Sequence, residues 1–62
     1  MSPRVELARR ILETLALGHC VSTLDAFQLR YWALRPEDSM LTLEEIAIRI
    51  LDHGERSAGQ GN

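Results

Sequence analysis

The stretch LTLEEI carries the clearest helix-start signal in the chain, and it limits what the rest can fold into. Thr42 is a favourable N-cap, and Glu45 three residues later completes a capping-box pattern. Leu41 and Ile46 occupy the two positions of a hydrophobic staple. We therefore predict a helix that starts at Thr42 and ends at Gly54, a residue suited to a C-terminal stop. Its predicted buried stripe is Leu43, Ile46, Ala47, Ile50 and Leu51.

Two further helical segments precede this one. Residues 2–18, SPRVELARRILETLALG, combine a capping serine, a proline at the first helical position and a closing glycine. Residues 22–35, STLDAFQLRYWALR, begin with Ser22 or Thr23 as the cap and stop before Pro36, because a residue that precedes proline disfavours helical geometry. No segment has the strict alternation of an exposed strand. The predicted fold class is all-α, a small trihelical bundle.

The chain has 62 residues, which is enough for one domain near the lower size limit for independent folding. We expect a single three-helix domain over residues 1–54 and a flexible, disordered tail over residues 55–62, where no large apolar side chain could anchor the chain. A core of this size contributes roughly 3–5 kcal/mol of net stability. Self-association or a bound partner is therefore expected, with a homo-oligomer as the default.

The charge pattern gives no general nucleic-acid signal. The formal net charge is −2, and all seven strong cations are arginines spread along the chain. A generic nucleic-acid binder needs a concentrated basic footprint to displace counterions from phosphates. The N-terminus lacks the apolar core of a signal peptide, and no window approaches the roughly 18 apolar residues of a spanning helix. We expect a cytoplasmic protein that does not enter a membrane.

The sequence gives little support for catalysis or for metal binding. His19 and Cys20 are adjacent, and the other histidine, His53, lies at the far end of the third helix. A structural zinc site needs four ligands, commonly in two spaced pairs. Neighbouring residues of an extended connector point to opposite sides, so the imidazole would not activate the thiol. We expect no enzyme activity, no cofactor and no metal site.

The middle segment carries apolar side chains on two sides. Leu24, Phe27, Tyr31 and Leu34 share one face at helical spacing, and we expect this face to dock on the other two helices. The opposite face carries Ala26, Leu29 and Ala33, with Trp32 to one side. Either the flanking helices sandwich the segment, or the second face binds a partner. In the second case the predicted contact residues are Leu29, Trp32, Ala33 and Ile48.

Residues 29–50, which contain LRY and TLEEIA, resemble the fourth region of primary bacterial sigma factors. The resemblance implies a role in transcription, with contacts to promoter DNA and core polymerase. In that family an arginine-rich recognition helix follows, whereas residues 52–62 here contain three glycines. The resemblance therefore implies a relative or a mimic without the base-reading part.

Residues 10–26, RILETLALGHCVSTLDA, resemble the opening of phage-associated helix-turn-helix and winged-helix domains. In that alignment residues 42–53 would be the recognition helix, and no wing follows it. Both resemblances imply a helix-turn-helix-like trihelical core.

These observations favour a small non-enzymatic regulator that binds another protein and self-associates. A phage-encoded or accessory inhibitor of transcription machinery fits the two resemblances. The alternative is a dimeric helix-turn-helix DNA-binding transcription regulator. Its predicted DNA contacts are Arg4, Arg9, Arg10 and Arg49.

Overall fold

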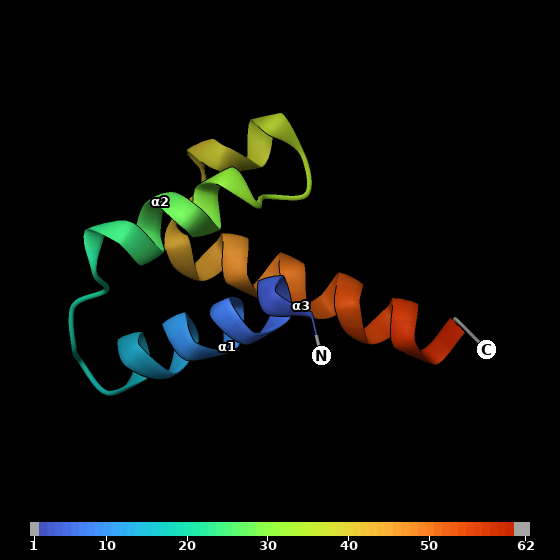
Figure 1. The fold of residues 1–62 in the computed structure, drawn as a ribbon, viewed down its shortest axis with the longest axis horizontal. Helices are drawn as coiled ribbons and strands as arrows, with labels where there is room; N and C mark the ends of the chain where they lie inside the picture. Colours follow the sequence, from blue (N-terminus) through green and yellow to red (C-terminus); the bar gives the residue numbers. More distant parts are fainter. Residues whose placement is uncertain (1, 61–62) are drawn as a thin grey trace.

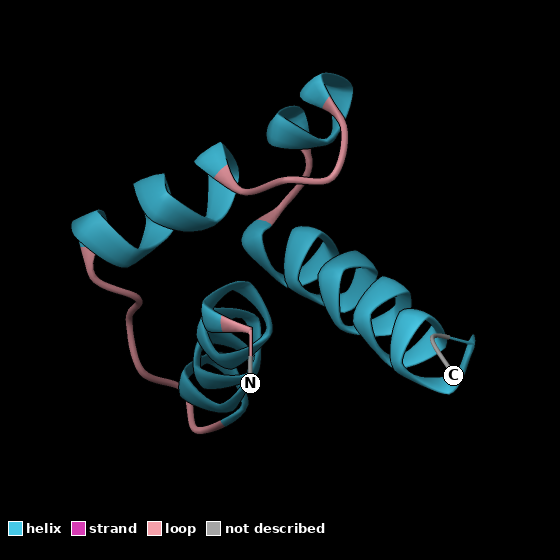
Figure 2. Ribbon diagram, turned by 45° about the vertical axis from the view of Figure 1, so that its right-hand side comes forward, coloured by secondary structure: helices cyan, strands magenta, loops and turns pink. Residues whose placement is uncertain are grey.

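A computed structural model describes the backbone of residues 2–60 and the side chains of residues 2–54. Three α-helices, α1 (Pro3–Ala16), α2 (Thr23–Tyr31) and α3 (Leu43–Gln60), are joined by short connections. The second connection contains a 3₁₀ turn, η1 (Pro36–Met40). The described residues contain no strand, which confirms the predicted all-α trihelical fold (Figure 2). None of the helices described here is both long and apolar enough to span a bilayer.

The first helix ends as its sequence predicts. Gly18 has a φ of 78°, which is the left-handed conformation that glycine adopts without steric cost. Its N–H donates to the Leu15 carbonyl, and the His19 N–H donates to the Thr14 carbonyl. These two bonds form a Schellman motif, which satisfies carbonyl groups that the helix end would otherwise leave unpaired. At the other end, Ser2 has the extended backbone of an N-cap and Pro3 is the first helical residue, as predicted. The Ser2 side chain makes no capping hydrogen bond, so the predicted side-chain cap is wrong.

Side-chain caps mark the starts of the other two helices. The Ser22 hydroxyl accepts from the Asp25 N–H, so Ser22 rather than Thr23 is the cap of α2. The Thr42 hydroxyl accepts from the Glu45 N–H and donates to the Glu45 carboxylate, at 3.2 Å in both cases. The predicted start of α3 at Thr42 is thus confirmed, with the glutamate bound to the threonine hydroxyl.

Both predicted C-terminal ends of the later helices are wrong. Helix α2 ends at Tyr31, four residues before the predicted end, where the Ala33 N–H tightens the last turn by donating to the Arg30 carbonyl. Arg35 has the extended backbone expected before proline. Helix α3 continues through Gly54 to Gln60. The tail predicted for residues 55–62 begins within this helix, because the backbone of residues 55–60 is helical. Residues 61–62 and the side chains of residues 55–60 lie outside the described part of the chain.

Gly54 has a packing role in place of the predicted stop. A Cβ atom built on Gly54 would lie 2.9 Å from Cγ2 of Val5 on α1, closer than such atoms normally approach. The missing side chain therefore lets α3 pass close to the start of α1. This explains a glycine inside a helix, where it costs about 1 kcal/mol relative to alanine.

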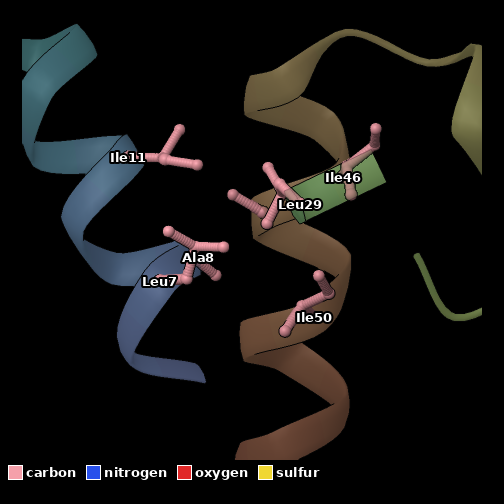
Figure 3. Packing of buried hydrophobic residues seen from close by; sticks show 7 residues of the cluster. Leu7, Ala8, Ile11, Leu29, Ile46 and Ile50 are labelled. Carbon is pink, nitrogen blue, oxygen red and sulfur yellow. The ribbon is translucent and has the colours of Figure 1, made fainter. Parts of the chain in front are cut away.

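The core lies between α1 and α3, with α2 covering one end (Figures 1 and 3). Ala8 and Ala47 are fully buried, and their small side chains let the two long helices approach closely. The predicted stripe of α3 is confirmed, with Ile46, Ala47 and Ile50 buried and Leu43 and Leu51 packed against them. The buried hydrophobic cluster consists of Leu7, Ala8, Ile11, Leu29, Ile46, Ala47 and Ile50.

Candidate functional site

Helix α2 is rotated relative to the sequence prediction. Leu29 is 0% exposed and lies among the buried side chains of α1 and α3, near Ile46 (Figure 3). Trp32 and Ala33 are partly buried and pack against the same cluster. Because Leu29 is enclosed within its own chain, it cannot take part in a contact surface of the folded monomer.

The four predicted contact residues therefore do not form one surface. Leu29, Trp32 and Ala33 turn toward the core, and Ile48 alone of the set is exposed, at 50% on the outer side of α3. The sequence prediction placed the outward face of α2 on the wrong side. The underlying observation, that α2 carries apolar side chains on two sides, remains.

The face of α2 that was predicted to be buried is exposed. Leu24, Phe27 and Tyr31 are 81%, 68% and 84% exposed, and Leu34, just beyond the helix, is 36% exposed. Spacings of three and four residues place the first three on one side of the helix. We call Leu24, Phe27 and Tyr31 the α2 outer face. It is unusual for a chain with so small a core to expose two aromatic rings and a leucine to solvent.

Side-chain sizes explain the orientation. On the inward side, Leu29 stands between Ala26 and Ala33, two small residues that are partly buried. This combination lets α2 approach the pair of long helices. Trp32, just beyond the helix, packs against the same cluster. The helix thus buries one leucine with its alanine neighbours and leaves Phe27 and Tyr31 outside.

Polar contacts link both ends of α2 to the rest of the chain. Nη2 of Arg10 on α1 lies 3.1 Å from Oδ1 of Asp25 at the start of α2. Near the other end, Nη1 of Arg30 donates to the Ser39 carbonyl at 2.6 Å and to the Leu41 carbonyl at 2.8 Å. Arg30 thus ties α2 to the segment that leads into α3.

Met40, the last residue of η1, is 87% exposed. It stands between Ser39 and Leu41 in the chain, and the carbonyls of both neighbours are bound to Arg30. An exposed, flexible thioether is typical of adaptable binding surfaces.

Two clefts border the bundle, each of about 280 Å³. The first lies between α1 and α2, where Trp32 and Leu7 provide apolar walls. Its other lining residues are polar or small: Pro3, Glu6, Arg10, Asp25 and Gln28. The second lies between η1 and α3, and its lining is Leu34, Arg35, Asp38, Arg49, Asp52 and His53. Asp38 is 7% exposed there, with arginines and a histidine around the same cleft.

The arginines of the DNA-binding alternative are interspersed with carboxylates. Arg9 and Arg10 border a shallow hollow on α1 together with Glu6 and Glu13, and Arg10 is paired with Asp25. Arg4 is half-buried on the same helix. Arg49 shares the second cleft with two aspartates. Over the described side chains, these four arginines form no continuous basic stripe.

Metal-ligating side chains do not gather in the described part of the chain. No group of three or more histidine, cysteine or carboxylate side chains there could hold a metal ion. His19 and Cys20 are both exposed in the connector between α1 and α2, and Cys20 is a free thiol.

Comparisons of the chain with protein-family models, with curated proteins and with solved structures found no match.

Proposed function

We propose that this protein is a small non-catalytic binding module that docks on another protein chain through the α2 outer face. The observation that carries the proposal is the exposure of Leu24, Phe27 and Tyr31 on one side of a short, well-fixed helix. Positions i, i+3 and i+7 are the anchor spacing with which a helix enters an apolar groove. Aromatic side chains bury a large area at little conformational cost, which favours them at the centres of interfaces.

The rigid attachment of α2 supports the same proposal. A helix that is held by the Arg10–Asp25 pair, by Arg30 and by the buried Leu29 presents its outer face in a fixed geometry. Preorganised anchors lose less freedom on binding than those of a flexible peptide. A cytoplasmic regulator of transcription machinery, phage-encoded or accessory, is the role that the sequence resemblances suggest for such a module.

DNA binding is less favoured by the surface of α3. The exposed side of this helix carries Glu44 and Glu45 in its first turn and Asp52 two turns later. Carboxylates on the face that would enter the groove oppose contact with phosphates. The connection between α2 and α3 spans residues 32–42, whereas a helix-turn-helix motif uses a turn of about 3–4 residues.

The proposal is tested by affinity capture from the native host with three versions of the full chain. We expect Phe27→Ser to reduce the recovered partner protein at least about tenfold, because a central aromatic anchor is lost. Ile48→Ser is the matched control, since it removes an exposed apolar side chain from α3. Equal recovery by the wild type and Phe27→Ser would contradict the proposal. Circular dichroism should show that all three versions stay helical, because exposed positions contribute little to stability.

A further inference from the structure

We infer that the protein that covers the α2 outer face is a second copy of this chain, packed antiparallel about a two-fold axis. The inference rests on the proposed function, because it names the occupant of the same face. It is carried by three features of α2: the area of the apolar face, the order of its side chains along the helix, and the direction of its helix dipole.

The area of the face matches the apolar part of a standard interface. Two aromatic rings and a leucine at the exposures given above present roughly 400–500 Å² of surface. A specific interface covers about 800 Å² on each partner, and about 56–58% of it is non-polar, which corresponds to about 450 Å². Thr23 and Gln28 flank the face on the helix and would supply part of the polar rim.

The order of the side chains is self-complementary. In a two-fold contact, residue i of one copy meets residue j of the other, and j meets i. With the axis midway between residues 27 and 28, Leu24 of each copy meets Tyr31 of the other. The two Phe27 rings then lie next to the axis, displaced from each other by about 1.5 Å along the helices. Such a displacement suits offset stacking, which aromatic pairs prefer over a face-to-face sandwich.

The dipole of α2 favours the same antiparallel arrangement. Antiparallel helices set the positive end of one dipole beside the negative end of the other. A parallel pair would bring like ends of the two dipoles together. Asp25 and Arg30 are bound within their own chain and stay out of the contact.

The test is sedimentation equilibrium of the full chain over about 5–500 µM. We expect the average mass to rise from 7.0 kDa toward twice that value with concentration, with a dissociation constant in the micromolar range because three anchors form a small contact. Phe27→Ser should raise the dissociation constant at least about 30-fold, the equivalent of one central hot spot. Ile48→Ser should associate like the wild type.

The possible outcomes separate the inference from the proposed function. A wild type that stays at 7.0 kDa over the whole range, or a Phe27→Ser variant that associates equally well, would overturn the second-copy inference. If the wild type is monomeric and Phe27→Ser still loses a captured host protein, the docking function stands and its occupant is a different chain. If Phe27→Ser changes neither association nor capture, both fail.

Cys20 provides an independent test of the antiparallel arrangement. This exposed thiol lies just before α2, so the antiparallel pair places its two copies at opposite ends of the contact. A disulfide requires Cα atoms within about 7 Å, which a parallel pair would allow and an antiparallel pair would not. Under mild oxidation we expect the wild type and Phe27→Ser to form disulfide dimers at the same slow rate. Faster formation in the wild type would overturn the antiparallel arrangement.

Discussion

The Leu29→Ala variant is expected to be largely unfolded at 25 °C. Leu29 is the one fully buried side chain that α2 contributes to the core within the described residues. Truncating a buried leucine to alanine costs about 2–5 kcal/mol, because the lost transfer free energy is joined by the cost of a cavity. A core of this size supplies roughly 3–5 kcal/mol in total. The measurement is the helical signal by circular dichroism during urea titration, at a concentration where the chain is monomeric.

Leu24→Ala is the matched control for this prediction. It makes the same chemical change on the same helix, but at a side chain that is 81% exposed. We expect its free energy of unfolding to stay within about 0.5 kcal/mol of the wild type. A Leu24→Ala variant that is less stable than Leu29→Ala would mean that α2 faces the core with its other side.

Arg30→Ala is expected to lower the free energy of unfolding by about 2 kcal/mol. The guanidinium donates to two carbonyl groups, and a hydrogen bond that involves a charged group contributes about 1.5–3 kcal/mol. The effect should be near the lower end of that range, because Arg30 is partly exposed and water can replace it in the variant. Loss of the contact frees the η1 segment, so amide hydrogen exchange of residues 37–41 should accelerate most.

Two other arginine variants make this prediction specific. Arg30→Lys keeps the charge but presents its donors from a single nitrogen with different geometry, so we expect an intermediate loss of stability. Arg35→Ala removes an exposed arginine only five residues away and should change the free energy of unfolding by less than about 0.5 kcal/mol. Equal stability of the Arg30→Ala and Arg35→Ala variants would show that the two carbonyl contacts contribute nothing.

The sequence predicted well those features that depend on interactions between residues close together in the chain. The Thr42 cap, the left-handed Gly18 and the start of α1 at Pro3 each depend on local hydrogen bonds and backbone angles. The buried stripe of α3 was also predictable, because one side of that helix is clearly more apolar than the other. Local signals of this kind do not depend on which helix becomes the neighbour.

The rotation of α2 could not be predicted in the same way. Both of its sides are apolar, so periodicity gave no preference, and the larger side chains were expected inside. The structure buries Leu29 between two alanines, packs Trp32 against the core and leaves Phe27 and Tyr31 outside. The small residues at 26 and 33 are the signal that could have indicated the choice. The helix end predicted at Gly54 is wrong for a related reason. The role of this glycine depends on its contact with Val5, which lies on a helix distant in sequence.

The orientation of α2 is tested most directly by hydroxyl-radical footprinting, with modification of each side chain measured by mass spectrometry. At low micromolar concentration, where the chain is monomeric, Phe27 and Tyr31 should be modified at rates close to those of the urea-unfolded chain, and Leu29 should be protected at least about tenfold. At 500 µM, protection should extend to Phe27 and Tyr31 but leave Ile48 unchanged. Rapid modification of Leu29 together with protected rings in the dilute sample would contradict the orientation and the docking surface that depends on it.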